Sequence, residues 1–244
     1  PLKEISEYQA INDCDWVLTG TGWSTSFEYD AIKIAKEKDK YVVSFIDHWV
    51  NFRERFNWHG PEILPNEIWV GDEDALEIAS DVLPEATVKL FPNPFWQDCI
   101  ELRDESSNFS QPEKKKILFV SSNIDGIRKN QNDIKFSDRE ILNKFLSQLE
   151  KLNFLEQVNQ ITVKPHPSEK FSKYIDFKAR SEVIDFSISN EKDNIELIKS
   201  HDFVIGYESM MLVLANLLGK TAINIDMGLQ RLKVIPDKFI DHVI

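Results

Sequence analysis

Cysteine is scarce in this sequence, and its scarcity excludes two kinds of architecture. The chain contains only two cysteines, Cys14 and Cys99, in unrelated sequence contexts. Two are too few for a disulfide framework, and neither belongs to a metal-binding pair. Because His59, His201 and His242 also lack metal-ligand spacing, we expect two free thiols in a reducing compartment and no bound metal.

Positive charge and long apolar runs are lacking as well. The chain carries 29 Lys and Arg against 41 Asp and Glu, a formal net charge of −12. Proteins that bind nucleic acids normally present a basic face, so we expect no nucleic-acid partner. No apolar run reaches the roughly 18 residues that a membrane-spanning helix needs, and no signal peptide opens the chain. We therefore expect a cytoplasmic protein, with peripheral association at a membrane left open.

What the sequence does contain is a regular alternation of short apolar runs and amphipathic stretches. This alternation predicts βαβ units with mostly parallel sheets, an α/β fold. A charged stretch at residues 99–115 predicts a linker between two Rossmann-like domains, residues 1–98 and 116–244. The expected strands are residues 15–19, 41–46, 67–70, 88–91, 116–121, 160–164, 183–186, 202–205 and 221–225, and the expected helices are residues 26–38, 73–80, 138–152, 194–200 and 209–218.

The loop Lys164-Pro165-His166-Pro167 follows one of the expected strands. In open α/β sheets, ligands bind at the carboxyl ends of the strands, so these loops are where function is expected. The two prolines fix the backbone on both sides of His166 and hold its imidazole in one place. Such a histidine suits a general acid or a phosphate contact. The alternative is a proline-rich turn with a solvated histidine.

A second loop, Gly206-Tyr207-Glu208-Ser209, joins the strand at 202–205 to the helix at 209–218. Ser209 can cap this helix, and the N–H groups and positive dipole end of a helix can hold a phosphate. The alternative is a cap without a ligand.

Two glycine-containing loops also follow expected strands. Gly20 and Gly22 allow a ligand to approach the backbone closely, but Thr25 stands where a dinucleotide-binding fingerprint has its third glycine. A phosphate cradle and a tight strand-to-helix turn both fit this loop. The loop after the strand at 116–121 carries Arg128, whose charge could reach a diphosphate.

The sequence Asp47-His48-Trp49 ends the expected strand at 41–46. A carboxylate at the carboxyl end of a strand is a reasonable general base. Arg53 and Arg55 follow closely, and they could bind an anionic acceptor or form surface ion pairs.

Two segments of the second half resemble a known family. Residues 161–167 (ITVKPHP) and 202–225 (DFVIGYESMMLVLANLLGKTAINI) are similar to the nucleotide-binding domain of GT-B glycosyltransferases. The nearest likeness is to bacterial sialyltransferases, polysialyltransferases and Kdo transferases with a His-Pro motif and a Ser motif. A GT-B N-terminal domain is usually about twice as long as the first half of this chain, so we expect that half to be incomplete.

The resemblance implies roles for several residues. His166 would contact the donor phosphate and assist its departure, Ser209 would hold the same phosphate, and Asp47 would act as the base. Because Gly22, Asp47, His166 and Ser209 all follow strands in a parallel α/β pattern, we expect them to line a cleft between the two halves. We also expect Glu208, Lys164, Gly22 and Arg128 on the donor side, and His48, Arg53 and Arg55 on the acceptor side.

The implied function is transfer of a sugar from a CMP- or UDP-activated donor to a bacterial surface-polysaccharide or lipopolysaccharide acceptor. We expect no metal and no cofactor beyond the nucleotide-sugar co-substrate, because we identify no Asp-x-Asp motif of the kind that holds a metal-bound sugar nucleotide. Two alternatives stay open. One is a UDP-sugar 2-epimerase, which shares the fold, and the other is a non-catalytic domain that binds a nucleotide or a polysaccharide.

Overall fold

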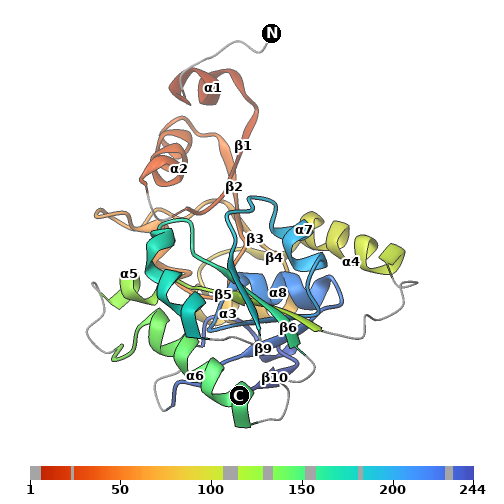
Figure 1. Ribbon diagram of the computed structural model, residues 1–244. Helices are drawn as coiled ribbons and strands as arrows, with labels where there is room; N and C mark the ends of the chain where they lie inside the picture. Colours follow the sequence, from red (N-terminus) through yellow and green to blue (C-terminus); the bar gives the residue numbers. More distant parts are fainter. Residues whose placement is uncertain are drawn as a thin grey trace. The chain divides into compact units, whose positions relative to one another are not determined.

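A computed structural model describes residues 7–22, 25–106, 115–128, 134–151, 158–180, 184–228 and 233–244. The chain divides into two compact units, Pro1–Gln97 and Asp98–Ile244. Each unit is built on its own parallel sheet with helices along the chain between the strands (Figure 1). The α/β fold with two parallel, Rossmann-like sheets is therefore confirmed.

The first unit contains a four-stranded sheet with strand order β1-β2-β3-β4, in which every neighbouring pair is parallel. Its buried core joins strand residues Val42, Ile46, Ile68 and Val70 to helix residues such as Ile32 and Ala79. The elements are α1 (Glu7–Asp13), β1 (Trp16–Thr19), α2 (Phe27–Glu37), β2 (Tyr41–Ile46), η1 (Glu54–Phe56), β3 (Glu67–Val70), α3 (Glu73–Val82) and β4 (Val88–Leu90).

The second unit contains a six-stranded parallel sheet with strand order β10-β9-β8-β5-β6-β7. Two helices of this unit, α6 and α8, begin next to the site described below. The elements are β5 (Lys115–Val120), α5 (Ile124–Arg128), α6 (Asp138–Lys151), β6 (Val158–Lys164), η3 (Phe171–Arg180), β7 (Asp185–Ile188), α7 (Asn194–Lys199), β8 (Phe203–Gly206), α8 (Met210–Leu217), β9 (Thr221–Asn224), η4 (Asp237–Phe239) and β10 (His242–Val243).

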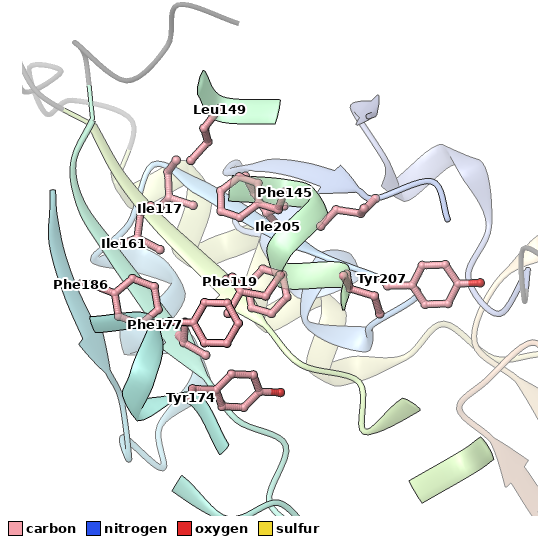
Figure 2. Packing of buried hydrophobic residues seen from close by; sticks show 14 of the residues in the cluster. Ile117, Phe119, Phe145, Leu149, Ile161, Tyr174, Phe177, Phe186, Ile205 and Tyr207 are labelled. Carbon is pink, nitrogen blue, oxygen red and sulfur yellow. The ribbon is translucent and has the colours of Figure 1, made fainter. Parts of the chain in front are cut away.

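The core of the second unit is aromatic on one face of its sheet. Phe119 of β5 stacks against Phe145 of α6 with ring centroids 6.0 Å apart, and Phe177 of η3 stacks against Phe186 of β7 at 6.3 Å (Figure 2). On β5, the apolar run continues through Leu118 and Val120, whose side chains alternate with that face and are also buried. A central parallel strand is buried on both faces, which explains why this segment shows no polar alternation.

The predicted linker at 99–115 needs a correction, because its first part is helical. Helix α4 runs over Pro94–Ser106, and Cys99 within it is fully buried. The Asn93 side chain accepts a hydrogen bond from Phe95 N at 3.1 Å, and Pro94 occupies the first helical position. Asn93 followed by Pro94 therefore starts a helix here. Residues 107–114 lie outside the described residues.

No helix formed by the described residues is both long and apolar enough to cross a membrane.

Candidate functional site

Three loops of the second unit meet at the carboxyl ends of adjacent strands. Strands β8, β5 and β6 are neighbours in the sheet, and residues 207–209, 121–123 and 165–168 follow them. The Ser122 hydroxyl donates to the carbonyl of Tyr207 at 2.5 Å, and the Asn123 amide donates to the Ser168 hydroxyl at 2.8 Å. These side chains link the three loops. We call residues 121–123, 165–168 and 207–209 together the carboxyl edge. His166 and Ser209, expected to act together, both follow strands at this edge.

His166 is exposed, and its loop is fixed by hydrogen bonds at both backbone and side chain. Its backbone N–H donates to a carboxylate oxygen of Glu169 at 2.9 Å, and Glu169 N–H donates back to the His166 carbonyl at 2.8 Å. The ring nitrogen Nδ1 lies 2.7 Å from Ser168 Oγ and 3.2 Å from Ser168 N. Pro165 is buried beneath the loop, whereas Pro167 is exposed. The imidazole is thus held by its Nδ1 side, and none of the described residues forms a hydrogen bond with Nε2.

A buried ionic cluster anchors this loop from below. The Asp138 side chain, 1% exposed, accepts hydrogen bonds from Ser121 Oγ and from the backbone N–H groups of Ile124 and Asp125 at 3.0–3.1 Å. Burial alone would raise the pKa of Asp138, but its hydrogen bonds from Lys173 and these N–H groups hold it below the ordinary value. Asp138 therefore joins the start of α6 to the loop after β5 as a charged group.

Lys173 lies at the centre of this cluster. Its ammonium group contacts Asp125 at 2.6 Å, Asp138 at 2.8 Å and also Glu169. Burial lowers the pKa of Lys173, but hydrogen bonds to the three carboxylates outweigh burial and raise it above the ordinary value. Carboxylate oxygens of the same three residues lie within 4.8 Å of one another, a spacing that could hold a metal ion. In this structure the lysine ammonium supplies the compensating positive charge.

An open pocket of about 360 Å³ lies beside the ionic cluster. It is lined mainly by polar and charged side chains, including that of Ser168, which contacts His166. Its lining residues are Asn123, Asp125, Gly126, Ser168, Glu169, Lys170, Ser172 and Lys173.

Ser209 caps helix α8, as the sequence pattern predicts. Its hydroxyl accepts a hydrogen bond from Met211 N at 3.4 Å, and its backbone is extended as an N-cap residue requires. Helix α8 begins at the carboxyl edge, because it starts directly after β8. This arrangement can bind an anion.

Glu208 has a different setting from the one expected for a ligand contact. It is buried, and one carboxylate oxygen accepts from the Asn224 amide at 2.7 Å. The other oxygen accepts from the backbone N–H groups of Val234 at 2.7 Å and Ile235 at 3.1 Å. Its carboxylate thus fastens the segment after β9 to the loop after β8, and its φ of 47° shows a left-handed backbone at the turn.

Two further residues expected on the donor side lie near the carboxyl edge. Lys164 ends β6 and its ammonium group donates to the carbonyl of Glu191, in the loop after β7. Arg128 ends α5 with its side chain 44% exposed and its guanidinium 3.8 Å from Asp125. At that distance and exposure the pair is weak, so Arg128 keeps its charge toward solvent.

In the first unit, Arg55 braces the glycine-containing loop after β1. Its guanidinium donates to the Thr21 carbonyl at 2.6 Å and to the Thr21 hydroxyl at 3.1 Å, and that hydroxyl donates to the Phe45 carbonyl at 3.3 Å. Arg55 therefore supports the loop between Gly20 and Gly22 directly. A Cβ on Gly22 would lie 3.0 Å from a carboxylate oxygen of Glu28, so the glycine accommodates this side chain.

Arg53 pairs with acidic side chains. It contacts Glu62 at 2.6 Å and Glu85 at 2.7 Å, and it also donates to the Val82 carbonyl at 2.8 Å. These contacts match the ion-pair alternative that the sequence left open for this residue.

Asp47 and His48 follow β2. Asp47 is exposed, whereas His48 is half-buried and its Nδ1 accepts from Trp49 N at 2.9 Å. Burial and the nearby Arg55 lower the pKa of His48 below the ordinary histidine value, although Asp47 acts in the opposite direction. The buried Trp49 indole donates to both oxygens of Asp72 at 3.0 Å, and Asp72 caps α3 through Ala75 N. The segment Asp72-Glu73-Asp74, which has Asp-x-Asp spacing, therefore lies at the start of helix α3.

Sequence reasoning missed the residues that hold His166 in place. Asp138 and Lys173 are 35 positions apart, and Asn123 and Ser168 are 45 positions apart. Of the residues that hold His166, Ser168 and Glu169 are close to it in sequence, whereas Asn123, Asp138 and Lys173 carry no local signal.

The comparisons with known proteins give similarity only among solved structures, and this similarity is remote. No protein-family model matches the chain, and no curated protein matches it. Among solved structures, it is similar to Thermosulfurimonas dismutans KpsC, a beta Kdo 2,4 transferase. The two chains share 15% sequence identity with a TM-score of 0.36, and the similarity covers 86% of this chain and 68% of that chain. A similarity at this identity and TM-score says nothing about the chemistry of the site, which has to be inferred from the side chains at the site itself.

Proposed function

We propose that the chain is a glycosyltransferase whose carboxyl edge in the second unit binds the phosphate of a nucleotide-activated sugar. The observation that carries this proposal is the setting of His166 at the same strand ends as the start of α8. The described residues hold it through Nδ1 and the backbone, and none of them forms a hydrogen bond with Nε2. A histidine donor and a helix N-terminus are complementary to an anion that gains charge as it leaves.

In the proposed reaction, the acceptor hydroxyl oxygen attacks the anomeric carbon of the donor sugar. The bond between that carbon and the phosphate oxygen breaks, and its electron pair stays with the phosphate. His166 donates a hydrogen bond from its Nε2–H to the departing oxygen, while Ser209 and the first turn of α8 bind the phosphate. The acceptor proton passes to a base, for which Asp47 is the hypothesis.

The finer features of the proposal follow from the sequence resemblance. We propose a CMP- or UDP-sugar as donor and a bacterial surface polysaccharide or lipopolysaccharide as acceptor, with the reaction taking place in the cytoplasm. Arg128 and Lys164 add positive charge around the donor phosphate. Glu208 supports the loop that carries Ser209, because its carboxylate accepts three hydrogen bonds from other parts of the unit.

The decisive experiment compares single variants in nucleotide binding and sugar transfer. Calorimetric titration with CMP, CDP, UDP and GDP identifies the nucleotide, and the matching sugar nucleotides are then tested for transfer and for hydrolysis. We expect His166→Ala to lower turnover by about 10²-fold with a modest loss of affinity, the usual scale for one hydrogen-bond donor directed at charge that develops in the transition state. We expect Ser209→Ala to weaken binding by about 1 kcal/mol, since it removes a cap and a hydrogen bond.

The control is His242→Ala, which removes another exposed histidine from the same unit. It should leave binding and turnover unchanged. Wild-type turnover by His166→Ala would contradict the catalytic assignment. Nucleotide binding without transfer or hydrolysis would instead establish a non-catalytic binding domain, and conversion of a UDP-sugar without any acceptor would establish an epimerase.

A further inference from the structure

The side chains of Asn123, Ser168 and His166 form a continuous chain of hydrogen bonds across two loops. The Asn123 amide nitrogen lies 2.8 Å from Ser168 Oγ, which lies 2.7 Å from Nδ1 of His166. Asn123 follows β5 and Ser168 follows β6, so the chain crosses between adjacent strands at the carboxyl edge. We propose that Asn123 and Ser168 are positioning residues that hold His166 in the tautomer with its proton on Nε2.

The direction of the hydrogen bonds follows from what each group can do. The amide nitrogen of Asn123 can only donate, so Ser168 Oγ accepts from it and keeps its own hydrogen for Nδ1. The backbone N–H of Ser168 also points at Nδ1, at 3.2 Å, and it too can only donate. Two donors therefore converge on Nδ1. A neutral imidazole that accepts at Nδ1 must carry its proton on Nε2.

The backbone and the neighbouring residues keep Asn123 in this arrangement. Its φ is 56°, a left-handed conformation that asparagine tolerates better than most residues. A Cβ on Gly126 would lie 2.3 Å from the Asn123 amide nitrogen and 2.7 Å from its amide oxygen. Only glycine at position 126 leaves room for the Asn123 side chain. This explains why α5 contains a glycine, a residue that is otherwise unfavourable inside a helix.

The tautomer has a direct chemical consequence, which rests on the proposed function. With the proton on Nε2, the free side of the ring offers an N–H donor to a phosphate oxygen. With the proton on Nδ1, the same side would present a lone pair to an anion and repel it. Asn123 and Ser168 would thus act on the leaving group through His166, without touching the ligand themselves.

The tautomer can be measured without any ligand or activity. In protein labelled with ¹⁵N-histidine, two-dimensional ¹H–¹⁵N spectra distinguish protonated from unprotonated ring nitrogens. Spectra are recorded near pH 8.5, about two units above the ordinary histidine pKa. For the wild type we expect His166 Nδ1 to give the signal of an unprotonated nitrogen and Nε2 that of a protonated one.

Asn123→Asp is the sharpest variant, because it keeps the shape of the side chain and reverses the hydrogen bond. A carboxylate accepts from the Ser168 hydroxyl, so Ser168 Oγ can then accept from a protonated Nδ1. We expect the Nε2-protonated fraction to fall in this variant. Asn123→Ala and Gly126→Ala should give mixed signals with a smaller change, because both remove the amide donor without replacing it by an acceptor.

Ser172→Ala is the matched control, since Ser172 lines the same pocket and lies on the same segment as Ser168. It should reproduce the wild-type spectrum, and Ser168→Thr should retain it because threonine keeps the hydroxyl. An unchanged tautomer in folded Asn123→Asp protein would overturn the inference, as would a wild-type spectrum with the proton on Nδ1. Either result leaves the nucleotide-binding test of the proposed function untouched.

Kinetics supply the second readout once a donor is known. Ser168→Ala should lower kcat by about 10-fold with KM nearly unchanged, the factor expected for one lost hydrogen bond of ordinary strength. In the His166→Ala background the same substitution should have no further effect, because a positioning residue acts only through the group it positions. An equal loss in both backgrounds would refute positioning.

Discussion

Replacing Lys173 with methionine tests the ionic cluster beneath the carboxyl edge. The substitution keeps the length of the side chain but removes the ammonium group that contacts Asp125, Asp138 and Glu169. The Asp138 and Glu169 side chains are only 1% and 3% exposed, so the variant leaves two buried carboxylates without their cation. Breaking a buried pair in this way costs about 3–5 kcal/mol.

The expected loss is large enough to measure in a thermal scan. For a unit of this size, each kcal/mol corresponds to a few degrees, so Tm should fall by about 10 °C. Lys170→Met is the control, because Lys170 is an exposed lysine on the wall of the same pocket. It should change Tm by no more than about 2 °C, since surface substitutions usually stay within about 0.5 kcal/mol.

The pH dependence gives a second measurement with a definite sign. In the wild type, the pKa of Asp138 is lowered in the folded state, so this group stabilises the fold above its unfolded pKa and loses that effect as pH falls through the folded pKa. In Lys173→Met, crowded buried carboxylates have raised pKa values, so the folded state gains protons first and becomes relatively more stable on acidification. The difference in Tm between the two proteins should therefore shrink between pH 7.5 and pH 5.

A divalent cation should also distinguish the variant from the wild type. Without the ammonium group, three carboxylates within 4.8 Å of one another form a set of oxygen ligands suited to Ca²⁺ or Mg²⁺. Millimolar Ca²⁺ should raise the Tm of Lys173→Met and leave that of the wild type unchanged. If Lys173→Met melts at the wild-type temperature, and neither pH nor Ca²⁺ changes its Tm relative to the wild type, the buried ionic cluster does not stabilise the fold.

The remaining predictions concern the core of the second unit. The ring of the buried His201 contacts the Leu197 carbonyl at 2.7 Å and Thr162 at 2.9 Å, and burial lowers the pKa of this histidine. The unfolded chain therefore takes up a proton at His201 before the folded chain does. As a result, the fold loses stability as pH falls below the ordinary histidine pKa toward the lowered pKa of the folded state. Urea unfolding of the wild type and of His201→Gln at pH 7.5 and 5.5 should show the smaller loss on acidification in the variant, and equal losses would contradict this. Phe119→Ala should destabilise by about 3–5 kcal/mol in urea unfolding, because Phe119 is 1% exposed and stacks on Phe145. A loss below about 1 kcal/mol would mean that the cavity is refilled by its neighbours.

Features written in contiguous residues were predictable from the sequence. The run Ile117–Val120 identifies β5 because a strand buried on both faces needs apolar residues at every position. The loops that carry His166 and Ser209 follow from their positions after strands. Helix α4 was missed because the charged residues 99–115 were interpreted as a linker, although Asn93 and Pro94 together are a helix start. Asn and Pro occur in turns as well as at helix starts, so only the spacing of the apolar residues that follow distinguishes a helix from a turn.

Features assembled from distant residues were not predictable. Asp138 looks like an ordinary acidic residue in the first turn of a helix, a position favoured by the helix dipole alone. Its burial depends on Lys173 and Ser121, which the fold brings to it from two other segments. The same holds for Asn123, whose partner Ser168 is a chain neighbour of His166 but not of Asn123. Sequence therefore located the loops of the site but not the hydrogen bonds that hold them.

The cross-links between the three loops also bear on the entropy of ligand binding. Ser122 ties the loop after β5 to the loop after β8, and Asn123 ties it to the loop after β6, before any ligand is present. A ligand that enters such a preorganised edge does not have to immobilise the loops itself, so less of its interaction energy is spent on ordering them. Small fragments then retain a large share of the affinity per atom of the complete ligand. Inorganic phosphate or a sugar phosphate is thus a practical starting point for soaking and fragment screening at this edge.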